Sequence, residues 1–371
     1  MSLRLEFVIK AQEEGANMAA LCREYHISRK TGYKWLSRYD PKNPQSLDDL
    51  STRPAGSPGR TPDWLRQLVL AVRLANPAWG GRKIRRHLFN QGIRTLPSPS
   101  TITTILHQAE AIDPEEAAKH RSYCRFEREF PNELWQMDHR SPLALGDGRC
   151  YPLTVLDDCS RFLLGLRASP DQTRHAVQTH LTDIFRLYGL PTAILTDNGP
   201  PWGYDREHPH TALTIWLLHL DVMVLHSRPY HPQTLGKGER FHRTLKAELL
   251  RDAHWPDLAV AQTHFDRFRT FYNEVRPHES LDMDVPASRY HPSHRTFPET
   301  LPAIEYQPGD VVRKVTAEGR VTLGNRRFRV SKGLRGYPVA LREGPEEGLL
   351  TVYFRHYVVG QIDLHSPSDV D

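Results

Sequence analysis

The pattern of hydrophobic and polar positions divides the chain into three parts with different periodicity. Up to about residue 110, apolar residues recur every three or four positions, which predicts short amphipathic helices. Between residues 131 and 284, short apolar runs alternate with longer helical stretches, which predicts an α/β layer with a mixed sheet. From residue 308 to 365, apolar and polar residues alternate between glycines, which predicts a small antiparallel β-barrel. The pattern therefore predicts a multidomain α/β protein.

Residues 1–40 predict three short helices, of which the last two are joined by a tight turn at residues 26–28. Ser28 is placed to cap the helix that follows. Two helices joined in this way form a helix-turn-helix, whose second helix enters the major groove of DNA. A purely structural three-helix bundle is the alternative. The side chains expected to contact DNA are Arg29, Lys30, Thr31 and Lys34.

Residues 62–112 repeat this helical pattern, with a turn at Trp79-Gly80-Gly81 and a basic helix directly after it. The repeat predicts a second helix-turn-helix, and Arg82 and Lys83 are its expected DNA contacts. Residues 41–61 are rich in proline, glycine and polar residues, which predicts a linker between the two units. A connecting helix is expected at 113–130.

The middle part, residues 131–284, is expected to fold as one α/β domain, followed by a proline-rich linker at 285–307. Its predicted strands are 133–138, 151–157, 162–168, 192–197 and 222–226, with a turn at 146–149 between the first two. Its predicted helices are 172–188, 208–219, 237–252 and 257–275. The strands of the C-terminal barrel expose Arg313, Lys314, Arg326, Arg327 and Arg329.

Three acidic residues stand at the ends of these middle elements. Asp138 ends the first predicted strand, Asp197 ends the fourth, and Glu239 lies near the start of a helix. Such a set of carboxylates suits cations that prefer oxygen ligands, and two of these ions can serve in-line phosphoryl transfer. Each residue alone also has an ordinary structural role, as a strand-end cap, a turn residue or a solvated helix residue. Their joint placement favours a metal site.

Charge is unevenly distributed along the chain. The net charge is +5, yet residues 1–130 contain 21 Lys and Arg against 14 Asp and Glu, and residues 308–342 contain nine against two. Basic ends around an acidic middle suit a protein that grips DNA at its flanks and holds cations centrally.

The remaining composition excludes other classes. The four cysteines form no CxxC pair and show no zinc-ligand spacing. No apolar run approaches the roughly 18 residues that cross a bilayer, and no signal-peptide core stands at the start, so a cytoplasmic protein without a membrane partner is expected.

Several longer motifs carry a resemblance to a known family. They include WQMD (135–138), LDDCSRF (156–162), TDNG (196–199), HPQTLGKGERFHRTLK (231–246) and YNEVRPHESL (272–281). In this order the chain resembles bacterial insertion-sequence transposases with a retroviral-integrase-type catalytic region. The resemblance implies an RNase H-like core in which Asp138, Asp197 and Glu239 are the catalytic DDE triad and hold two Mg²⁺ or Mn²⁺ ions.

The same resemblance implies the activity and the partners. The expected reaction is metal-dependent cleavage of the ends of a mobile element, followed by transfer of the 3′-OH into target DNA. Expected partners are double-stranded DNA, comprising terminal inverted repeats and target, and further copies of the chain, because two element ends must be brought together. In the bacterial cytoplasm, the DNA-bound protein would associate with the nucleoid. A DNA-binding regulator without catalysis and a nuclease of the same fold are the alternatives.

Basic residues surround the third acid on its predicted helix. Lys237, Arg240, Arg243 and Lys246 are expected to hold phosphates of the element end, and a solvated basic face is the alternative. Asp158 and Arg161 are interpreted as a structural pair.

The chain departs from the family at two places. Asp197 and Glu239 are 42 positions apart, a longer spacing than usual, which is attributed to a polar loop at 202–211. His139 follows the first Asp where an aromatic residue is usual. The expected consequence is altered packing beside Asp138, with little effect on the metal site.

Overall fold

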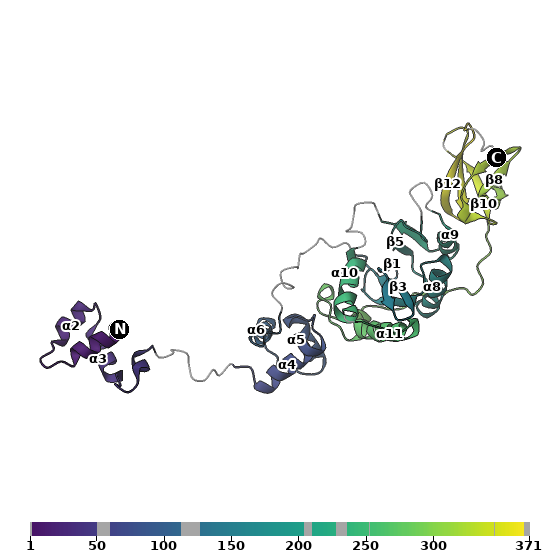
Figure 1. Ribbon diagram of the computed structural model, residues 1–371. Coiled ribbons are helices and arrows are strands. Elements are labelled where there is room, and N and C mark those ends of the chain that lie inside the picture. The colour runs from purple at the N-terminus through teal and green to yellow at the C-terminus, as the bar shows by residue number, and fades with distance from the viewer. Residues whose placement is uncertain are drawn as a thin grey trace. The chain divides into compact units, whose positions relative to one another are not determined.

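The chain divides into two compact units, Met1–Thr61 and Pro62–Asp371. The computed structural model describes residues 2–49, 60–112, 127–203, 210–227, 236–251, 253–344 and 346–366 (Figure 1). The predicted connecting helix falls mostly at 113–126, outside the described residues, and residues 127–130 are not helical.

The first unit contains the three predicted helices, α1 (Leu3–Ala11), α2 (Met18–Glu24) and α3 (Arg29–Arg38). Its small core is built around Phe7, which is fully buried and meets Tyr25 and Trp35 edge to face. Ser28 caps α3 as predicted, since its hydroxyl accepts a hydrogen bond from the Thr31 amide at 3.1 Å. The unit extends beyond its predicted end: a 3₁₀ turn at Pro44–Leu47 places Leu47 in the same core.

The second unit begins with another three-helix group, α4 (Asp63–Ala75), α5 (Gly81–Asn90) and α6 (Pro99–Gln108). Gly81 permits the close approach of α5 to α6, because a Cβ there would lie 2.4 Å from the Pro99 carbonyl oxygen. This group is not tethered at a distance from the α/β domain. Trp79 is fully buried and stacks on Phe271 of the α/β domain with ring centroids 5.7 Å apart, and Arg86 forms an ion pair with Asp284.

The α/β domain contains a mixed six-stranded sheet whose main order is β2-β3-β1-β5-β6, with β4 also pairing with β3. β1 lies antiparallel to β3 and parallel to β5, which is parallel to β6. The strands are β1 (Leu134–His139), β2 (Leu143–Leu145), β3 (Gly148–Asp157), β4 (Leu163–Ser169), β5 (Ala193–Thr196) and β6 (Met223–His226). The short β2 was not predicted; its residues precede the expected turn and pair with the start of β3.

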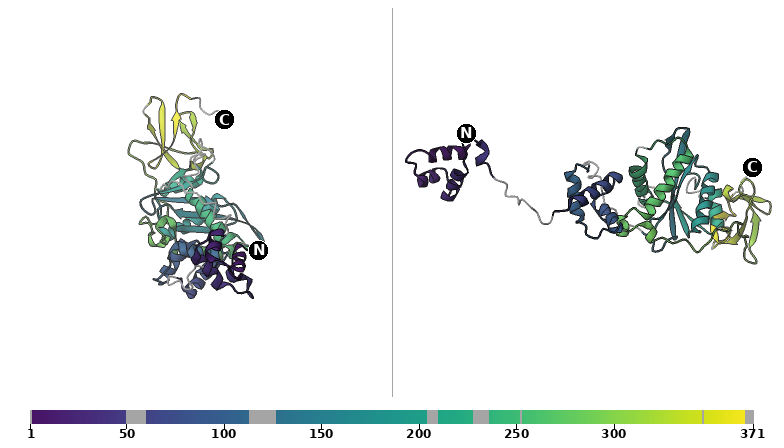
Figure 2. Two further views of the ribbon diagram at one scale, coloured as in Figure 1. Left: turned by 90° about the vertical axis from the view of Figure 1, so that its left-hand side faces the viewer. Right: turned by 90° about the horizontal axis from the view of Figure 1, so that it is seen from below.

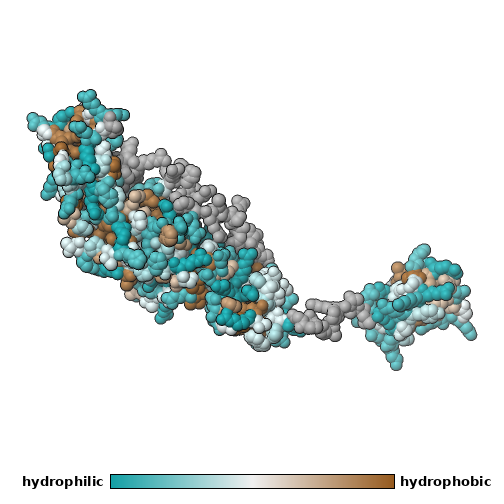
Figure 3. Space-filling view, turned by 180° about the vertical axis from the view of Figure 1, so that it is seen from behind, coloured by the Kyte–Doolittle hydropathy of each residue, from teal (hydrophilic) through white to brown (hydrophobic). Residues whose placement is uncertain are grey.

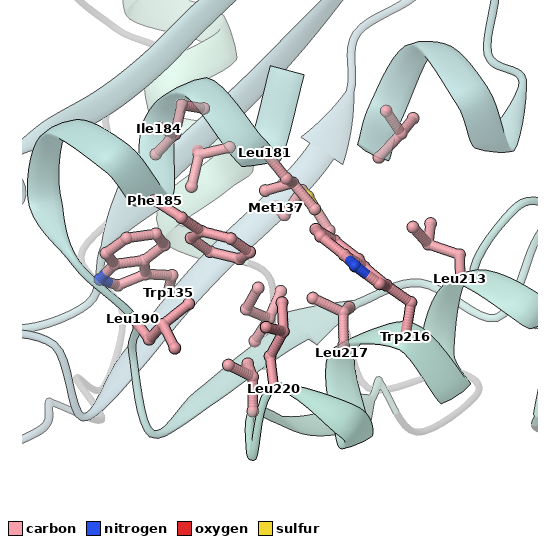
Figure 4. Packing of buried hydrophobic residues seen from close by; sticks show 14 of the residues in the cluster. Trp135, Met137, Leu181, Ile184, Phe185, Leu190, Leu213, Trp216, Leu217 and Leu220 are labelled. Atoms are coloured by element: carbon pink, nitrogen blue, oxygen red, sulfur yellow. The ribbon is translucent and has the colours of Figure 1, made fainter. Parts of the chain in front are cut away.

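Helices cover both faces of this sheet, as the right-hand view of Figure 2 shows. On one face, α8 (Arg174–Tyr188) and α9 (Ala212–His219) pack on Trp135 and Met137 of β1 (Figure 4). On the other, α10 (Gly236–Leu245) and α11 (Leu258–Glu274) bury Phe241, Leu245 and Phe265 among others. Because side chains alternate along a strand, Gln136 and Asp138 lie on the α10 side.

The motif YNEVRPHESL packs the end of α11 onto the sheet. Asn273 is buried and binds both backbone groups of Leu163, accepting from the amide at 2.8 Å and donating to the carbonyl at 3.0 Å. Arg276 pairs at 2.9 Å with Glu248 of η3 (Lys246–Leu250), a π-helical turn that continues α10. These contacts join α10, α11 and the sheet into one body.

The predicted linker at 285–307 is not a free tether but lies against the α/β domain. Tyr290 stacks on Phe162 with ring centroids 4.2 Å apart. Arg295 donates to the backbone carbonyls of Pro191, Leu220 and Asp221. Proline content therefore predicted the lack of helix and strand here, apart from 3₁₀ turns such as η5 (Pro286–Ser288), but not the packing.

The C-terminal part contains antiparallel strands as predicted, but the described strands form two sheets rather than one closed barrel. A four-stranded sheet has the order β12-β11-β10-β7, and β8 pairs only with β9. The strands are β7 (Val311–Lys314), β8 (Arg320–Leu323), β9 (Arg326–Arg329), β10 (Pro338–Glu343), β11 (Leu349–Phe354) and β12 (Tyr357–Asp363). Their shared core includes Ile215 and Leu218 of α9, so part of the apolar surface packs on a helix instead of on further strands.

On the face shown in Figure 3, hydrophobic residues appear in small separate groups among hydrophilic ones. Among the described residues, no helix combines the length and the apolar character needed to span a membrane.

Candidate active site

Asp138 and Asp197 lie at the same edge of the sheet. β1 and β5 are adjacent and parallel, with Gln136 opposite Leu195, so both strands end at this edge. Asp138 is the fifth residue of β1, and Asp197 follows the last residue of β5 directly. The parallel pairing, which sequence alone did not specify, brings together two residues that are 59 positions apart.

Glu239 approaches this edge from the first turn of α10. It is exposed, whereas Gly238 before it and Phe241 after it are buried. Its carboxylate is close enough to contribute to the raised pKa of Asp138. Asp138 is therefore within electrostatic range of both other acids, and Glu239 is the most exposed of the three.

The electrostatics of Asp138 are set by burial and by the neighbouring acids. Burial and then the negative charge of Asp197 raise its pKa to about 7, with a smaller contribution from Glu239. A divalent cation bound by carboxylate oxygens would offset this repulsion, so the donor set fits Mg²⁺ or Mn²⁺. Within the described ranges, no group of three or more His, Cys, Asp or Glu side chains is drawn together tightly enough to hold a metal ion as it stands.

Backbone and polar contacts hold the end of β5. The Gly199 amide donates to Asp197 Oδ1 at 3.2 Å, and the Asn198 side chain donates to the Ser227 carbonyl at 2.9 Å. His226 Nδ1 lies 3.0 Å from the Asp197 carbonyl oxygen. The motif TDNG thus ends β5 in a bend in which the Gly199 amide holds the Asp197 carboxylate.

His242 is a neighbour of Asp138 that the sequence analysis did not identify. Its Nδ1 lies 3.9 Å from Asp138 Oδ2, and its Nε2 lies 3.0 Å from Thr154 Oγ1, which donates to the Asp138 carbonyl oxygen. Burial, and then the charge of Arg140, lower the pKa of His242 to about 4, so the ring is neutral near pH 7. The signal was available: Glu239 and His242 are three residues apart and share one helix face.

His139 fills the position where an aromatic residue was expected. Its ring stacks on Trp202 with centroids 5.9 Å apart, and burial lowers its pKa to about 4, which keeps it neutral near pH 7. Trp202 is buried in the core between β1 and helices α8 and α9, and it is the first residue of the predicted extra loop. That loop is therefore anchored beside Asp138 at its start; residues 204–209 lie outside the described part of the chain.

The residues predicted to contact DNA differ in their exposure. Arg29, Lys30 and Lys34 are exposed on α3, and the Thr31 hydroxyl bonds with that of Ser28. Arg82 is exposed, whereas Lys83 is partly buried, and burial and then the charge of Arg276 lower its pKa to about 8. Arg240, Arg243 and Lys246 are exposed, and Arg240 lies 3.8 Å from Glu279.

Lys237 is engaged inside the protein, contrary to the expectation that it holds phosphates. Its Nζ lies 2.6 Å from Asp158 Oδ2, and its side chain is 17% exposed. Asp158 was interpreted as a partner of Arg161; Arg161 donates to its backbone carbonyl and pairs with Glu127, whereas the Asp158 carboxylate binds Lys237. A charge buried in this way needs an opposite charge nearby, and Lys237 supplies it.

Comparisons with protein families match successive parts of the chain. Integrase core domain models match residues 128–232 and 220–286. A helix-turn-helix domain matches residues 3–55, and a homeodomain-like domain matches 31–106. The C-terminal domain of IS481 family transposases matches residues 310–369. The chain thus matches models of helix-turn-helix domains, of an integrase core domain and of the IS481 transposase C-terminal domain, and the resemblance seen in the sequence is confirmed.

Individual relatives agree with these matches. The chain is 35% identical over 129 residues to the Gag-Pro-Pol polyprotein of Mason-Pfizer monkey virus, covering 34% of this chain and 7% of that protein. It is 26% identical over 180 residues to an uncharacterized 39.2 kDa protein of insertion element IS476 from Xanthomonas euvesicatoria, covering 48% and 50%. The chain therefore spans only a small part of the polyprotein and half of the insertion-element protein.

Among solved structures, the HTLV-2 integrase catalytic core domain in complex with magnesium is similar at 17% identity. The match covers 44% of this chain and 99% of that domain, with a TM-score of 0.34.

Proposed function

We propose that this protein is a DNA transposase that cleaves the ends of a mobile element and joins the freed 3′-OH to target DNA. The observation that carries the proposal is the meeting of Asp138 and Asp197 at the ends of adjacent parallel strands, with Glu239 close enough to raise the pKa of Asp138. The matches to an integrase core domain and to an IS481 transposase C-terminal domain support it.

Asp138, Asp197 and Glu239 would hold two Mg²⁺ or Mn²⁺ ions through carboxylate oxygens. The chemistry that such ions would supply there is Lewis-acid assistance to an in-line displacement at phosphorus. The same carboxylates serve cleavage and joining, because water and a 3′-OH are equivalent nucleophiles in this arrangement. Asp138 must be deprotonated to act as a ligand, and its raised pKa makes that step depend on pH.

DNA would be bound by the two helix-turn-helix groups and by exposed basic residues near the acids. Arg29, Lys30, Thr31 and Lys34 on α3 and Arg82 and Lys83 on α5 are proposed for the first role, and Arg240, Arg243 and Lys246 for the second. Because two element ends must meet, we expect at least two copies of the chain on the DNA, measurable by light scattering of the complex.

The decisive experiment is strand joining by the Asp197→Asn variant of the full chain. Its substrate is a duplex that carries the DNA flanking the gene, with Mg²⁺ as the only divalent cation. We expect joining to fall by about 10²–10³-fold, the usual loss when one preorganised charge-stabilising group is removed, with unchanged DNA binding.

The exposed turn residue Asp147 gives the matched control, since Asp147→Asn changes the same atoms outside the site. Retention of Mg²⁺-dependent joining by Asp197→Asn would overturn the triad. Hydrolysis without joining by the unaltered chain would indicate a nuclease, and DNA binding without any nicking would indicate a regulator.

A further inference from the structure

A buried ion pair joins the start of α10 to the end of β3. The ammonium of Lys237 lies 2.6 Å from Asp158 Oδ2 and also donates to the Asp158 carbonyl oxygen at 3.0 Å. The Asp158 side chain is fully buried. Its Oδ2 also accepts from the Arg128 amide at 2.9 Å, so the carboxylate is held by backbone and side-chain donors together.

Gln136 connects this pair to the strand that carries Asp138. Its Nε2 donates to Asp158 Oδ1 at 2.8 Å, and its Oε1 accepts from the Gly238 amide at 3.2 Å. Gln136 is 4% exposed and lies two residues before Asp138, on the same face of β1. Gln136 and Asp138 thus have different roles on the same side of β1: Gln136 binds α10 through the Gly238 amide, and Asp138 lies near Asp197 and Glu239.

Glu239 directly follows the two anchored residues of α10. It is itself exposed, so its own packing does not fix its position. The fixed points are Lys237 and Gly238 before it and the buried Phe241 after it. A shift of the first helical turn would therefore move Glu239 relative to Asp138 and Asp197.

We propose that Gln136, Asp158 and Lys237 form a clamp that sets the position of Glu239, and thereby the affinity of the three acids for a divalent cation. The proposal rests on the proposed function, because it concerns the same cation site. It makes these three residues positioning residues rather than ligands. It also gives a role to two motif residues outside the triad: Asp158, the second Asp of LDDCSRF, and Lys237, the Lys of GKGER.

The test is Mn²⁺ binding by the full chain without DNA, measured by electron paramagnetic resonance of free Mn²⁺. Lys237→Met removes the clamp's cation and leaves all three acids in place. We expect the Kd for Mn²⁺ to rise about 10–100-fold, the usual effect of losing a group that orients metal ligands. Joining should recover at high Mn²⁺ concentration, whereas joining by Asp197→Asn should stay about 10²–10³-fold slower at any Mn²⁺ concentration.

The control variant is Arg186→Met, which removes an exposed ion pair with Glu299 of similar length, 2.7 Å, on the opposite side of the sheet. It should leave Mn²⁺ affinity unchanged. If Lys237→Met fails to fold because Asp158 is left as an uncompensated buried charge, the double variant Asp158→Asn with Lys237→Gln replaces both charges by amides. That variant should also bind Mn²⁺ about tenfold more weakly.

Hydrogen exchange of the unaltered, metal-free chain gives a measurement that needs no variant. The Gly238 amide should exchange slowly, because Gln136 accepts its hydrogen bond. Wild-type Mn²⁺ affinity in either folded clamp variant, or rapid exchange at Gly238, would overturn the clamp and leave the proposed function standing. Failure of the unaltered chain to bind Mn²⁺ would instead overturn the cation site.

Discussion

Two groups of acidic residues lie close together in the α/β domain and have opposite surroundings. Asp157 and Asp158 are fully buried, and each carboxylate is surrounded by donors. Asp157 accepts from the Asn132 amide at 2.8 Å and from the Ser160 amide and hydroxyl at 2.7 and 2.6 Å. Asp138, by contrast, faces the carboxylates of Asp197 and Glu239.

The difference shows that burial alone does not distinguish a structural acid from a functional one. Burial raises the pKa of Asp157 as well, but the hydrogen bonds from Ser160 and Asn132 oppose that rise. At Asp138, after burial, the next contribution is repulsion by Asp197, which adds to the rise. Asp157 also has an acidic neighbour, Asp158, which raises its pKa, but the hydrogen bonds from Ser160 and Asn132 compensate. The informative quantity is therefore how far hydrogen-bond donors offset the charge of the neighbouring acids, and an acid without such compensation is one that a cation would stabilise.

The largest effect that would sharpen this comparison concerns Glu239. Glu239→Gln keeps the size of an exposed side chain and removes one carboxylate from the acidic group. We expect Mg²⁺-dependent joining to fall by about a hundredfold, because one charge-stabilising group is lost, while the thermal midpoint stays within about 1 °C. Joining at the normal rate would show that the third acid is not part of the group.

The next effect concerns Asp157, the buried acid whose carboxylate accepts three hydrogen bonds. In Asp157→Asn, an amide NH₂ replaces one of two oxygens that accept hydrogen bonds, so two donors face each other in a buried place. The free energy of unfolding should fall by about 2–3 kcal/mol, measured by urea denaturation. Mn²⁺ affinity should not change in the folded variant, and a change would mean that the two acidic groups are coupled.

The last effect has the opposite sign although the substitution is the same. Asp138→Asn removes a carboxylate whose pKa is raised, so the metal-free chain should be stabilised at pH 8 by up to about 4 kcal/mol, since each pKa unit corresponds to about 1.4 kcal/mol. The folded pKa of about 7 lies above the ordinary value of 3.8, so this group makes the unaltered chain lose stability as pH rises from about 4 to 7. Urea denaturation in EDTA at several pH values measures how steeply the free energy of unfolding falls with pH, and this slope should be smaller in Asp138→Asn.

Added Mn²⁺ provides the control for that pH series, because a bound cation should remove the fall in the free energy of unfolding between pH 4 and 7 in the unaltered chain. Equal slopes in Asp138→Asn and the unaltered chain would contradict the assignment of the raised pKa to this residue.

The sequence predicted most elements of the fold because their periodicity is strong. The expected helix at 257–275 corresponds to α11 at Leu258–Glu274, and the expected strand at 192–197 to β5 at Ala193–Thr196. It was wrong in predicting that the C-terminal strands close into a barrel, since alternation specifies which residues face inward but not whether strands or a helix cover them; the described strands form two sheets. Here α9 supplies Ile215 and Leu218. The packing of 285–307 depends on partners such as Phe162, which periodicity cannot reveal.

For the candidate site, the motifs predicted three acids but not their surroundings. Those acids, Asp138, Asp197 and Glu239, are near enough for the last two to raise the pKa of the first. Lys237 looked like one of four basic residues along a helix, and only the fold shows that it faces the buried Asp158. His242 lies three residues after Glu239 and so on the same helix face, which was the one signal for it, but sequence does not show that this face turns toward Asp138.

The stacking of Trp79 on Phe271 has a consequence for how length along DNA would be measured. If the α4–α6 group binds a specific base sequence, its packing on the α/β domain fixes the distance between that sequence and the three acids. A DNA-binding group on a flexible linker would instead tolerate variable distances. The number of base pairs between the recognised sequence and the cleaved bond would then be set by the protein. Moving that sequence by half a helical turn would place it on the wrong side of the duplex.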